Sequence, residues 1–435
     1  MKKVLALILA LALCFACVAC GNTQDEQANN NKPSDSQGEQ SNTDTVKVGV
    51  LLPLSGATAS PGEYQLEGMQ LAVDYVNANG GIKSMGGAKV KLVVSDTAGE
   101  VETGITEAER LITVENVSAI CGPYNSGVAA ATAPICIQYG VPYVVVNAVA
   151  DNIMQNGANK YVYRTNFGGA DMSPFRGLIV DYLGSLTNEG KLDKIAVIYD
   201  AGDWGTSEYE SYKAVADERG IEVVVAEAIT TNSSDLSSLV NKIKNSGADA
   251  VFCGIFLNDA ILFSKTMREY NCDVQIVGSG SGFSDAKYLE AMGAAAEGVM
   301  GTRAFNPSYG TKEGAATTFY EEYLASHNNV PMPEETSNGF CGMGTILEAL
   351  EIAGSAEREA IADALYDIDL DDTSLPLWYT MFDGVKFNTE GDELERYNQN
   401  VEIGETAGQI LVQIIDGKWE LVYPTERATA DIVFP

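Results

Sequence analysis

The segment CGPYNSGVAAATAP, residues 121–134, carries groups that could bind an anion at a turn between a strand and a helix. The preceding run VSAIC predicts a strand, and VAAATAPICIQYG predicts a helix that ends at Gly140. The first amides of a helix have no partners within it, and the helix dipole favours negative charge there. Ser126 adds a hydroxyl, Tyr124 an apolar wall, and Gly127 room for close approach of a ligand. The segment is therefore a candidate carboxylate site. The alternative is a plain Gly-Pro turn in which Ser126 caps the helix.

Residues for other chemistry are sparse. Asp200 and Asp203 lie close together, but two carboxylates three positions apart in a loop occur often by chance. His327 is the only histidine, in the polar stretch SHNNVP. The run GSGSG follows a predicted strand, yet it does not fit G-x-G-x-x-G and comes too late in the chain for dinucleotide binding. We therefore expect neither an enzyme nor a cofactor.

The cysteines beyond the N-terminal segment show no metal-ligand spacing, and no C-x-x-C occurs among them. Most lie in apolar runs and are expected to pack as small core residues. We expect no metal, and because their number is odd, at least one is free. They are Cys121, Cys136, Cys253, Cys272 and Cys341.

The first residues predict export. MKK is followed by the short apolar run VLALILALALCFACVA, which is typical of a signal peptide. The run ends at CVACGN, a pattern similar to that of bacterial lipoproteins, so we expect residues 1–19 to be removed and Cys20 to carry lipid. Residues 20–45 hold almost no large apolar side chain and predict a disordered tether. The alternative is a plain secretion signal.

The chain is 435 residues long, enough for two or three domains, and its formal net charge is −33. A surface this acidic repels phosphate backbones, so binding to nucleic acid is not expected.

Valine-rich strands alternate with amphipathic helices from residue 46 onward. Strands are predicted at 46–54, 89–96, 117–122 and 142–147, and a second series begins with KIAVIYD at 194–200. This alternation predicts an α/β fold with two doubly wound parallel sheets. The segment 161–174 reads as a crossover between them, and the last runs, DGVKFNTEGDELERYNQNVEI and QILVQIIDGKWELVYP, as antiparallel strands.

Seven motifs follow one another along the chain: VKVGVLLPLSG, EGMQLAVDYVNANGGI, AERLITVENVSAICGPYNSG, GVPYVV, YVYRTNF, KIAVIYDAGDWG and DGKWELVYP. In this order they resemble the leucine/isoleucine/valine-binding (branched-chain amino acid) family of ABC-transporter substrate-binding proteins, which has the type I periplasmic-binding fold. The resemblance implies two lobes joined by a three-strand hinge, closing on one small molecule. Lobe one is expected at 46–164 plus about 300–377, and lobe two at 165–299 plus about 378–435.

The resemblance also implies ligand positions in lobe one. Ser126 matches a serine that grips a ligand carboxylate, and Tyr124 and Asn125 match wall residues. After the next strand the family shows Ser-x-Ala-x-Thr, whereas this chain has VNAVADN. Three positions there are expected ligand contacts, although an alanine replaces the threonine: Asn147, Ala148 and Ala150.

In lobe two, the resemblance implies contacts from Asp171, from Trp204, and from Phe256 or Leu257. Gly280 stands where amino-acid binders of this family place an acid that pairs with the ligand ammonium. An unpaired buried ammonium is costly. Either another acid supplies the partner (Asp171, Asp203 or Asp259), or the solute is an amide, a urea-like compound or an aromatic acid.

The resemblance thus implies an extracytoplasmic protein, lipid-anchored to the bacterial membrane, that captures a small carboxylate-bearing solute by hinge closure. The solute would be a branched-chain or other amino acid, delivered to the permease of an ABC importer. The same fold serves ligand-sensing receptors. Such a receptor would carry a transmembrane helix and a signalling domain, and we expect neither here, which favours transport.

Overall fold

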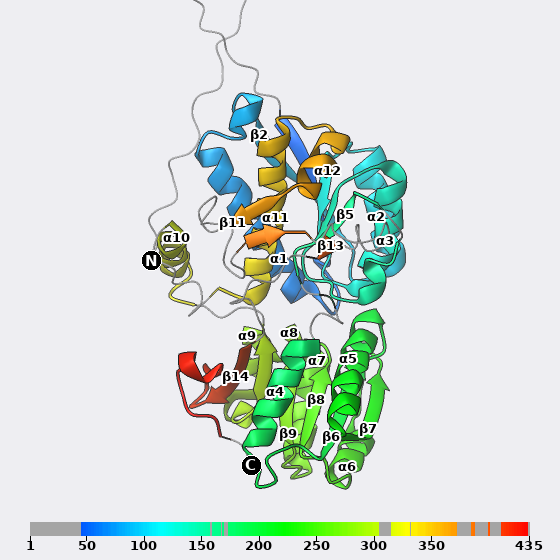
Figure 1. Ribbon diagram of the computed structural model, residues 1–435, viewed down its shortest axis with the longest axis vertical. Coiled ribbons are helices and arrows are strands. Elements are labelled where there is room, and N and C mark those ends of the chain that lie inside the picture. The colour runs from blue at the N-terminus through cyan, green and yellow to red at the C-terminus, as the bar shows by residue number, and fades with distance from the viewer. Residues whose placement is uncertain are drawn as a thin grey trace, which may run out of the picture. The chain divides into compact units, whose positions relative to one another are not determined.

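Two sheets of mainly parallel strands, each covered by helices, form the framework of the protein (Figure 1). The computed structural model describes residues 45–156, 159–166, 168, 173–303, 315–330, 332–371, 384–387, 399–400 and 410–433. The predicted leader, nearly all of the tether with Cys20, and Asp171 lie outside these ranges. Within them, no helix is both long and apolar enough to cross a bilayer.

The first sheet has six strands in the order β13-β5-β4-β3-β1-β2, and every pairing in it is parallel. Its strands are β1 (Thr45–Leu52), β2 (Lys89–Asp96), β3 (Ala119–Cys121), β4 (Tyr143–Val145), β5 (Val162–Arg164) and β13 (Gln399–Asn400). Burial explains the valine-rich runs, because both faces of a central parallel strand lie under helices. Val48, Val50 and Leu52 of β1 are all 0% exposed.

The second sheet has seven strands in the order β15-β14-β10-β9-β8-β6-β7. Its strands are β6 (Lys194–Asp200), β7 (Glu222–Ile229), β8 (Ala250–Gly254), β9 (Gln275–Ser279), β10 (Met300–Arg303), β14 (Ile410–Ile415) and β15 (Lys418–Tyr423). The pairings from β7 to β10 are parallel, whereas β14 and β15 join the edge as an antiparallel hairpin that turns at Asp416 and Gly417. The antiparallel strands predicted for QILVQIIDGKWELVYP are confirmed here. The prediction is wrong for the end of DGVKFNTEGDELERYNQNVEI, because β13 pairs parallel with β5. A separate antiparallel pair joins β11 (Asp369–Asp371) to β12 (Gly384–Lys386).

The helices follow the predicted alternation. They are α1 (Ala59–Ala78), α2 (Val101–Thr113), α3 (Ser126–Tyr139), α4 (Ser173–Ser185), α5 (Asp203–Arg219), α6 (Ser237–Lys244), α7 (Leu257–Glu269), α8 (Ser281–Ser284), α9 (Ala286–Met292), α10 (Ala315–Ser326), α11 (Glu334–Ala353) and α12 (Arg358–Tyr366). Short 3-10 turns are η1 (Lys83–Met85), η2 (Asp151–Ile153), η3 (Gly293–Ala296) and η5 (Thr425–Arg427).

Helices α1 and α11 pack along each other although some 260 positions separate them in the chain (Figure 1). Glycines make this approach possible. A β-carbon at Gly68 would lie 1.9 Å from the carbonyl oxygen of Thr336, and one at Gly339 would lie 2.2 Å from that of Gln65. Helix α11, although late in the chain, therefore packs in the hydrophobic core of the first sheet.

Strand pairing refines the expected lobe boundaries at two places. Met300–Arg303, expected near the start of the returning part of lobe one, pairs in the second sheet. Gln399–Asn400, expected in lobe two, pairs with β5 in the first sheet. The three hinge crossovers fall largely outside the described residues, so the remaining boundaries and the hinge stay predictions.

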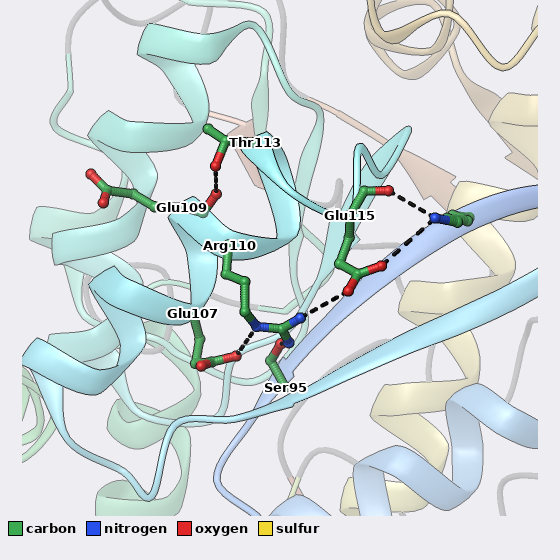
Figure 2. A network of polar contacts seen from close by, with 7 residues as sticks. Ser95, Glu107, Glu109, Arg110, Thr113 and Glu115 are labelled. Carbon is green, nitrogen blue, oxygen red and sulfur yellow. Dashed lines mark hydrogen bonds and ion pairs between the residues drawn. The ribbon is translucent and has the colours of Figure 1, made fainter.

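A surface network fixes the end of α2 against the first sheet (Figure 2). Arg110 donates to Glu107 at 2.8 Å, to Glu115 at 3.1 Å and to Ser95 of β2 at 2.7 Å. Lys47 of β1 donates to the backbone carbonyl of Glu115 at 3.1 Å. These groups are half-exposed, and such pairs contribute little energy each. The network orients α2, which packs beside α3.

Candidate functional site

The start of helix α3 presents backbone amides without a side-chain cap at the end of strand β3. Strand β3 ends at Cys121, the Gly122–Pro123 peptide is cis, and Asn125 is the extended residue before the helix. No side chain caps this helix, and its first turn holds no acidic residue. The amides of Ser126, Gly127 and Val128 therefore have no partner within the helix and no capping side chain. The alternative in which Ser126 is the N-cap is wrong, because the helix begins at Ser126 itself.

Ser126 is held in place by the loop that follows β4. The backbone amide of Ala150 donates to Oγ of Ser126 at 3.3 Å, and Ser126 is 3% exposed. This contact uses the oxygen as an acceptor, so the hydroxyl proton of Ser126 can still be donated to a ligand. Asn125 is oriented separately by Thr58, whose hydroxyl lies 3.3 Å from the Asn125 side chain.

A cavity of about 70 Å³ lies at Ser126, and its wall comes from both sheets and their helices. The volume is small beside the roughly 300 Å³ at the lower end for ligand pockets, which favours a small solute and requires movement of its walls on binding. The lining residues are Tyr124, Asn125, Ser126, Asn147, Val149, Asn166, Trp204, Glu208, Phe256, Ser279, Gly280, Thr302 and Glu334.

Three aromatic rings form the apolar side of the cavity. The ring centroids of Trp204 and Phe256 are 4.9 Å apart, and those of Tyr124 and Phe256 are 6.4 Å apart. Tyr124 follows β3 of the first sheet. In the second half, Phe256 follows β8, and Trp204 lies in the first turn of α5, after β6. The rings thus come from both halves of the chain around the cavity. Of the two alternatives, Phe256 lines the cavity and Leu257 does not; a ligand contact from Phe256 stays a prediction.

Gly280 allows Trp204 to lie against the end of β9. Its φ is +66°, a value that favours glycine, and a β-carbon there would lie 3.0 Å from Cζ2 of Trp204. Gly280 departs from the family pattern, which has an acidic side chain at this position. Here the indole of Trp204 occupies the space beside Gly280 that such a side chain would fill.

Among the described residues, the lining holds two carboxylates, Glu208 and Glu334, and no lysine, arginine or histidine. Glu208 is 3% exposed, pairs with the guanidinium of Arg176, and accepts a hydrogen bond from Ser279 Oγ at 2.5 Å. Arg176 is 1% exposed and lies over the ring of Tyr212, 5.1 Å from its centroid. Hydrogen-bond donors at the start of α3 and the acidic side chains of Glu208 and Glu334 are thus combined in one cavity.

The structure brings most of the expected site residues together. Those that line the cavity are Tyr124, Asn125, Ser126, Asn147, Trp204, Phe256 and Gly280. Asn338 of α11 donates a hydrogen bond to the side-chain oxygen of Asn147.

Ala148 and Ala150 do not line the cavity; their side chains pack in the core beneath α3. Alternation along an extended segment explains this, because Asn147 and Val149 point to one side and the two alanines to the other. A contact through the alanine backbone stays a prediction.

Two acids named as possible ammonium partners lie elsewhere. Asp203 accepts a hydrogen bond from Asn152 at 3.2 Å. Asp259 accepts from the amides of Asn232 and Ser233 at 2.9 and 2.8 Å, and its burial raises the pKa of the carboxyl. Asp171, the third, lies outside the described residues.

Six lining residues were not found from the sequence: Val149, Asn166, Glu208, Ser279, Thr302 and Glu334. For three of them, the position in the sequence next to an expected contact could have indicated the cavity. Val149 lies between two expected contacts, Ser279 precedes Gly280, and Glu208 comes one helical turn after Trp204. Nothing in the local pattern marks Asn166, Thr302 or Glu334, which reach the cavity only because three distant segments converge.

The sequence model described as Periplasmic binding protein matches residues 45–391. The chain belongs to this family. Curated relatives place it among the Leu/Ile/Val-binding members. Leu/Ile/Val-binding protein homolog 7 of Brucella suis is 34% identical, and the alignment covers 90% of this chain and 94% of the relative. Leu/Ile/Val-binding protein homolog 8 of Brucella abortus is 33% identical, and the alignment covers 89% of this chain and 93% of the relative.

Solved structures of periplasmic binding proteins share the fold. The branched-chain amino acid transporter substrate binding protein LivJ of Streptococcus pneumoniae, in complex with isoleucine, has a TM-score of 0.72 at 22% identity and covers 90% of this chain and 100% of its own. A solute binding protein of an ABC transporter from R. palustris, in complex with benzoate, has a TM-score of 0.71 at 21% identity and covers 90% and 98%. Two parallel-sheet lobes of the type I periplasmic-binding fold are therefore the architecture of this chain.

Proposed function

We propose that the protein captures a small carboxylate-bearing solute outside the cytoplasm and delivers it to the permease of an ABC importer. One observation carries the proposal: the uncapped start of α3, with Ser126, lines a cavity that both sheets enclose. A carboxylate fits the amides and hydroxyl there, and the remainder of the solute fits against Tyr124, Trp204 and Phe256. Capture is binding rather than catalysis.

Most support for an amino acid comes from the relatives' names and from the isoleucine bound to a protein of the same fold. The asymmetry of the cavity agrees with it, since a zwitterion carries both the carboxylate that α3 suits and an amine that an acidic wall suits. Closure of the lobes over the solute is the expected mechanism, because contacts from both lobes stabilise the closed state over the open one.

Aromatic acids are the second candidate. The three rings of the wall favour a flat apolar body, and a structural neighbour holds benzoate. An aromatic acid would use the same carboxylate site at α3 and would leave the acidic wall without a partner.

Anchoring at the membrane is a further part of the proposal. The CVACGN pattern would place lipid on Cys20, and residues 20–45 would tether the binding lobes to the surface. Labelling of expressed protein with a fatty-acid probe, compared with a Cys20→Ser variant, tests this directly. Label on both proteins, or on neither of them, would contradict the proposal that Cys20 carries a lipid anchor.

A thermal-shift screen tests the proposed capture. The panel is leucine, isoleucine, valine, phenylalanine, benzoate and 4-hydroxybenzoate, with leucinamide as the control that lacks the carboxylate. A solute at 100 times its Kd stabilises the folded state by about 2.7 kcal/mol, which raises the melting temperature by several degrees. We expect a shift with at least one acid and none with leucinamide. Equal shifts for leucine and leucinamide, or no shift with any acid, would contradict the proposal.

A further inference from the structure

The acidic residues in the wall of the cavity raise a question of charge. A carboxylate-bearing solute enters a cavity whose lining, within the described residues, holds two acids and no basic side chain. Such a wall repels a simple anion unless the solute also brings a positive group to it. The position and partners of the acids decide which of them meets that group.

Glu208 is placed beside the indole of Trp204. Both residues lie on α5, four positions apart, so their side chains point to the same face of the helix. Both line the cavity. Gly254 of β8 leaves the room that Glu208 needs, because a β-carbon there would lie 3.1 Å from Cβ and Cγ of Glu208.

The partners of Glu208 orient its carboxylate and leave some of its hydrogen-bond acceptor positions unused. One carboxylate oxygen pairs with Arg176, and the other accepts from Ser279 at 2.5 Å. Arg176 offsets the cost of burying the charge, yet Arg176 itself does not line the cavity. A carboxylate offers about four acceptor positions, so Glu208 can accept a further hydrogen bond from the cavity side.

Glu334 is less suited to the same role. It is half-buried at the start of α11 and also borders a second, larger hollow that contains Glu335, Arg303 and Lys418. Its charge therefore faces a mixed environment, whereas Glu208 is enclosed at the ligand cavity alone.

We propose that Glu208 recognises a protonated amine on the solute, and that the protein therefore selects amino acids over the matching acids without the amine. The inference rests on the proposed function and names its solute class. In this arrangement the carboxylate of the solute lies at the amides of α3, and its protonated amine donates a hydrogen bond to the carboxylate of Glu208. An acid without an amine would leave buried acceptors unpaired, which is the kind of mismatch that discriminates strongly.

Calorimetric titration of two matched pairs tests the proposal: leucine against 4-methylpentanoate, and phenylalanine against 3-phenylpropanoate. The readout is the ratio of the two Kd values within each pair, which a merely structural role would not change. Wild-type protein is expected to favour the amino acid, and Glu208→Gln to reduce that preference about ten- to hundredfold, the size of one hydrogen bond to a charged group. Glu210→Gln is the control, since Glu210 is an exposed acid on the same helix.

Each outcome decides the matter. An unchanged ratio in Glu208→Gln, or a loss of preference in Glu334→Gln alone, would overturn the role of Glu208. If Glu208→Gln does not fold, Glu208→Asp replaces it. The shorter side chain keeps a carboxylate for Arg176 but draws it back from the cavity, so the preference for the amino acid over the matching acid must still fall. Equal binding of acids and amino acids by the wild type would overturn this inference while leaving solute capture intact. No binding of any of the four compounds or of the aromatic acids would instead overturn the proposed function.

Discussion

The backbone amide of Ala150 donates a hydrogen bond to Oγ of Ser126 at 3.3 Å, which ties the loop after β4 to the first residue of α3. The sequence shows an alanine where the family pattern has a threonine, and its amide rather than its side chain serves the site. Ser126 is thus fixed at the cavity with its hydroxyl proton free for an anion.

Ser126→Ala should weaken solute binding at least about tenfold, because a hydrogen bond to a charged group is lost. The unfolding free energy should fall by only about 1 kcal/mol, since the helix keeps its amides and its packing. Calorimetric titration and chemical denaturation measure the two effects. Ser185→Ala, at an exposed position on α4, is the control and should change neither. Unaltered affinity in Ser126→Ala would exclude the assigned contact.

Trp204 should report on binding through its fluorescence. Its indole lies 4.9 Å from Phe256, measured between ring centroids, at the edge of the cavity, so a bound solute must change its surroundings. Titration with a solute that binds by calorimetry should change the emission of the wild type, and Trp204→Phe should remove most of the change. A signal that survives in Trp204→Phe would place the responding tryptophan elsewhere.

Gly280→Ala should lower both stability and affinity. A non-glycine residue at φ +66° costs about 1 to 3 kcal/mol, and the new β-carbon would displace Trp204. Gly220→Ala is a matched control, because Gly220 has φ +65° and its β-carbon would meet nothing within 4 Å. Melting curves should show destabilisation in both variants, whereas titration should show weaker binding only in Gly280→Ala. Similar binding by both would mean that Trp204 need not hold its position.

His327 should make stability depend on pH. Burial opposes protonation of the ring, but hydrogen bonds to the Tyr323 carbonyl at 2.8 Å and to Glu67 at 2.8 Å raise the pKa of His327 overall. A raised pKa in the folded state stabilises the protein below the unfolded value of about 6.5, and this contribution is lost as pH rises through the folded value.

The His327→Gln variant should therefore lose more stability at pH 5.5 than at pH 8.5, by up to about 1 kcal/mol for a pair this exposed. Other groups around the ring are Ser326, which lies 2.9 Å from Nδ1, and the stacked ring of Tyr323. Glu67→Gln should show the same pH dependence of its loss. Equal losses at the two pH values would show that the pair does not titrate in this range.

The fold was largely predictable because its strands are rich in β-branched residues. KIAVIYD coincides with β6, a central strand that is mostly buried, and KVKLVVSD and EVVVAEAI coincide with the partly exposed edge strands β2 and β7. The apolar patterns YQLEGMQLAVDYVNANGG and SEYESYKAVADERG predict helices that begin later than α1 and α5 do. The first turns contain Pro61 and Gly62 in α1, and Asp203 and Gly205 in α5, and these residue types predict a loop in isolation.

The site was predictable where a ligand position follows a strand. Ser126, Trp204 and Gly280 each come within a few residues of a strand's carboxyl end, the edge at which open parallel sheets bind ligands. Glu208 was missed because its role depends on a buried partner, Arg176, that is 32 residues away in the chain. No local pattern encodes that pairing.

The central claim is that the free amides of α3 hold the acidic end of a solute, and NMR of ¹⁵N-labelled protein tests it most directly. On addition of a solute that binds by calorimetry, the amide signals of Ser126, Gly127 and Val128 should move downfield, as expected when an N–H donates to a carboxylate. Unmoved signals from these three amides, with large changes confined to residues away from the cavity, would contradict the account.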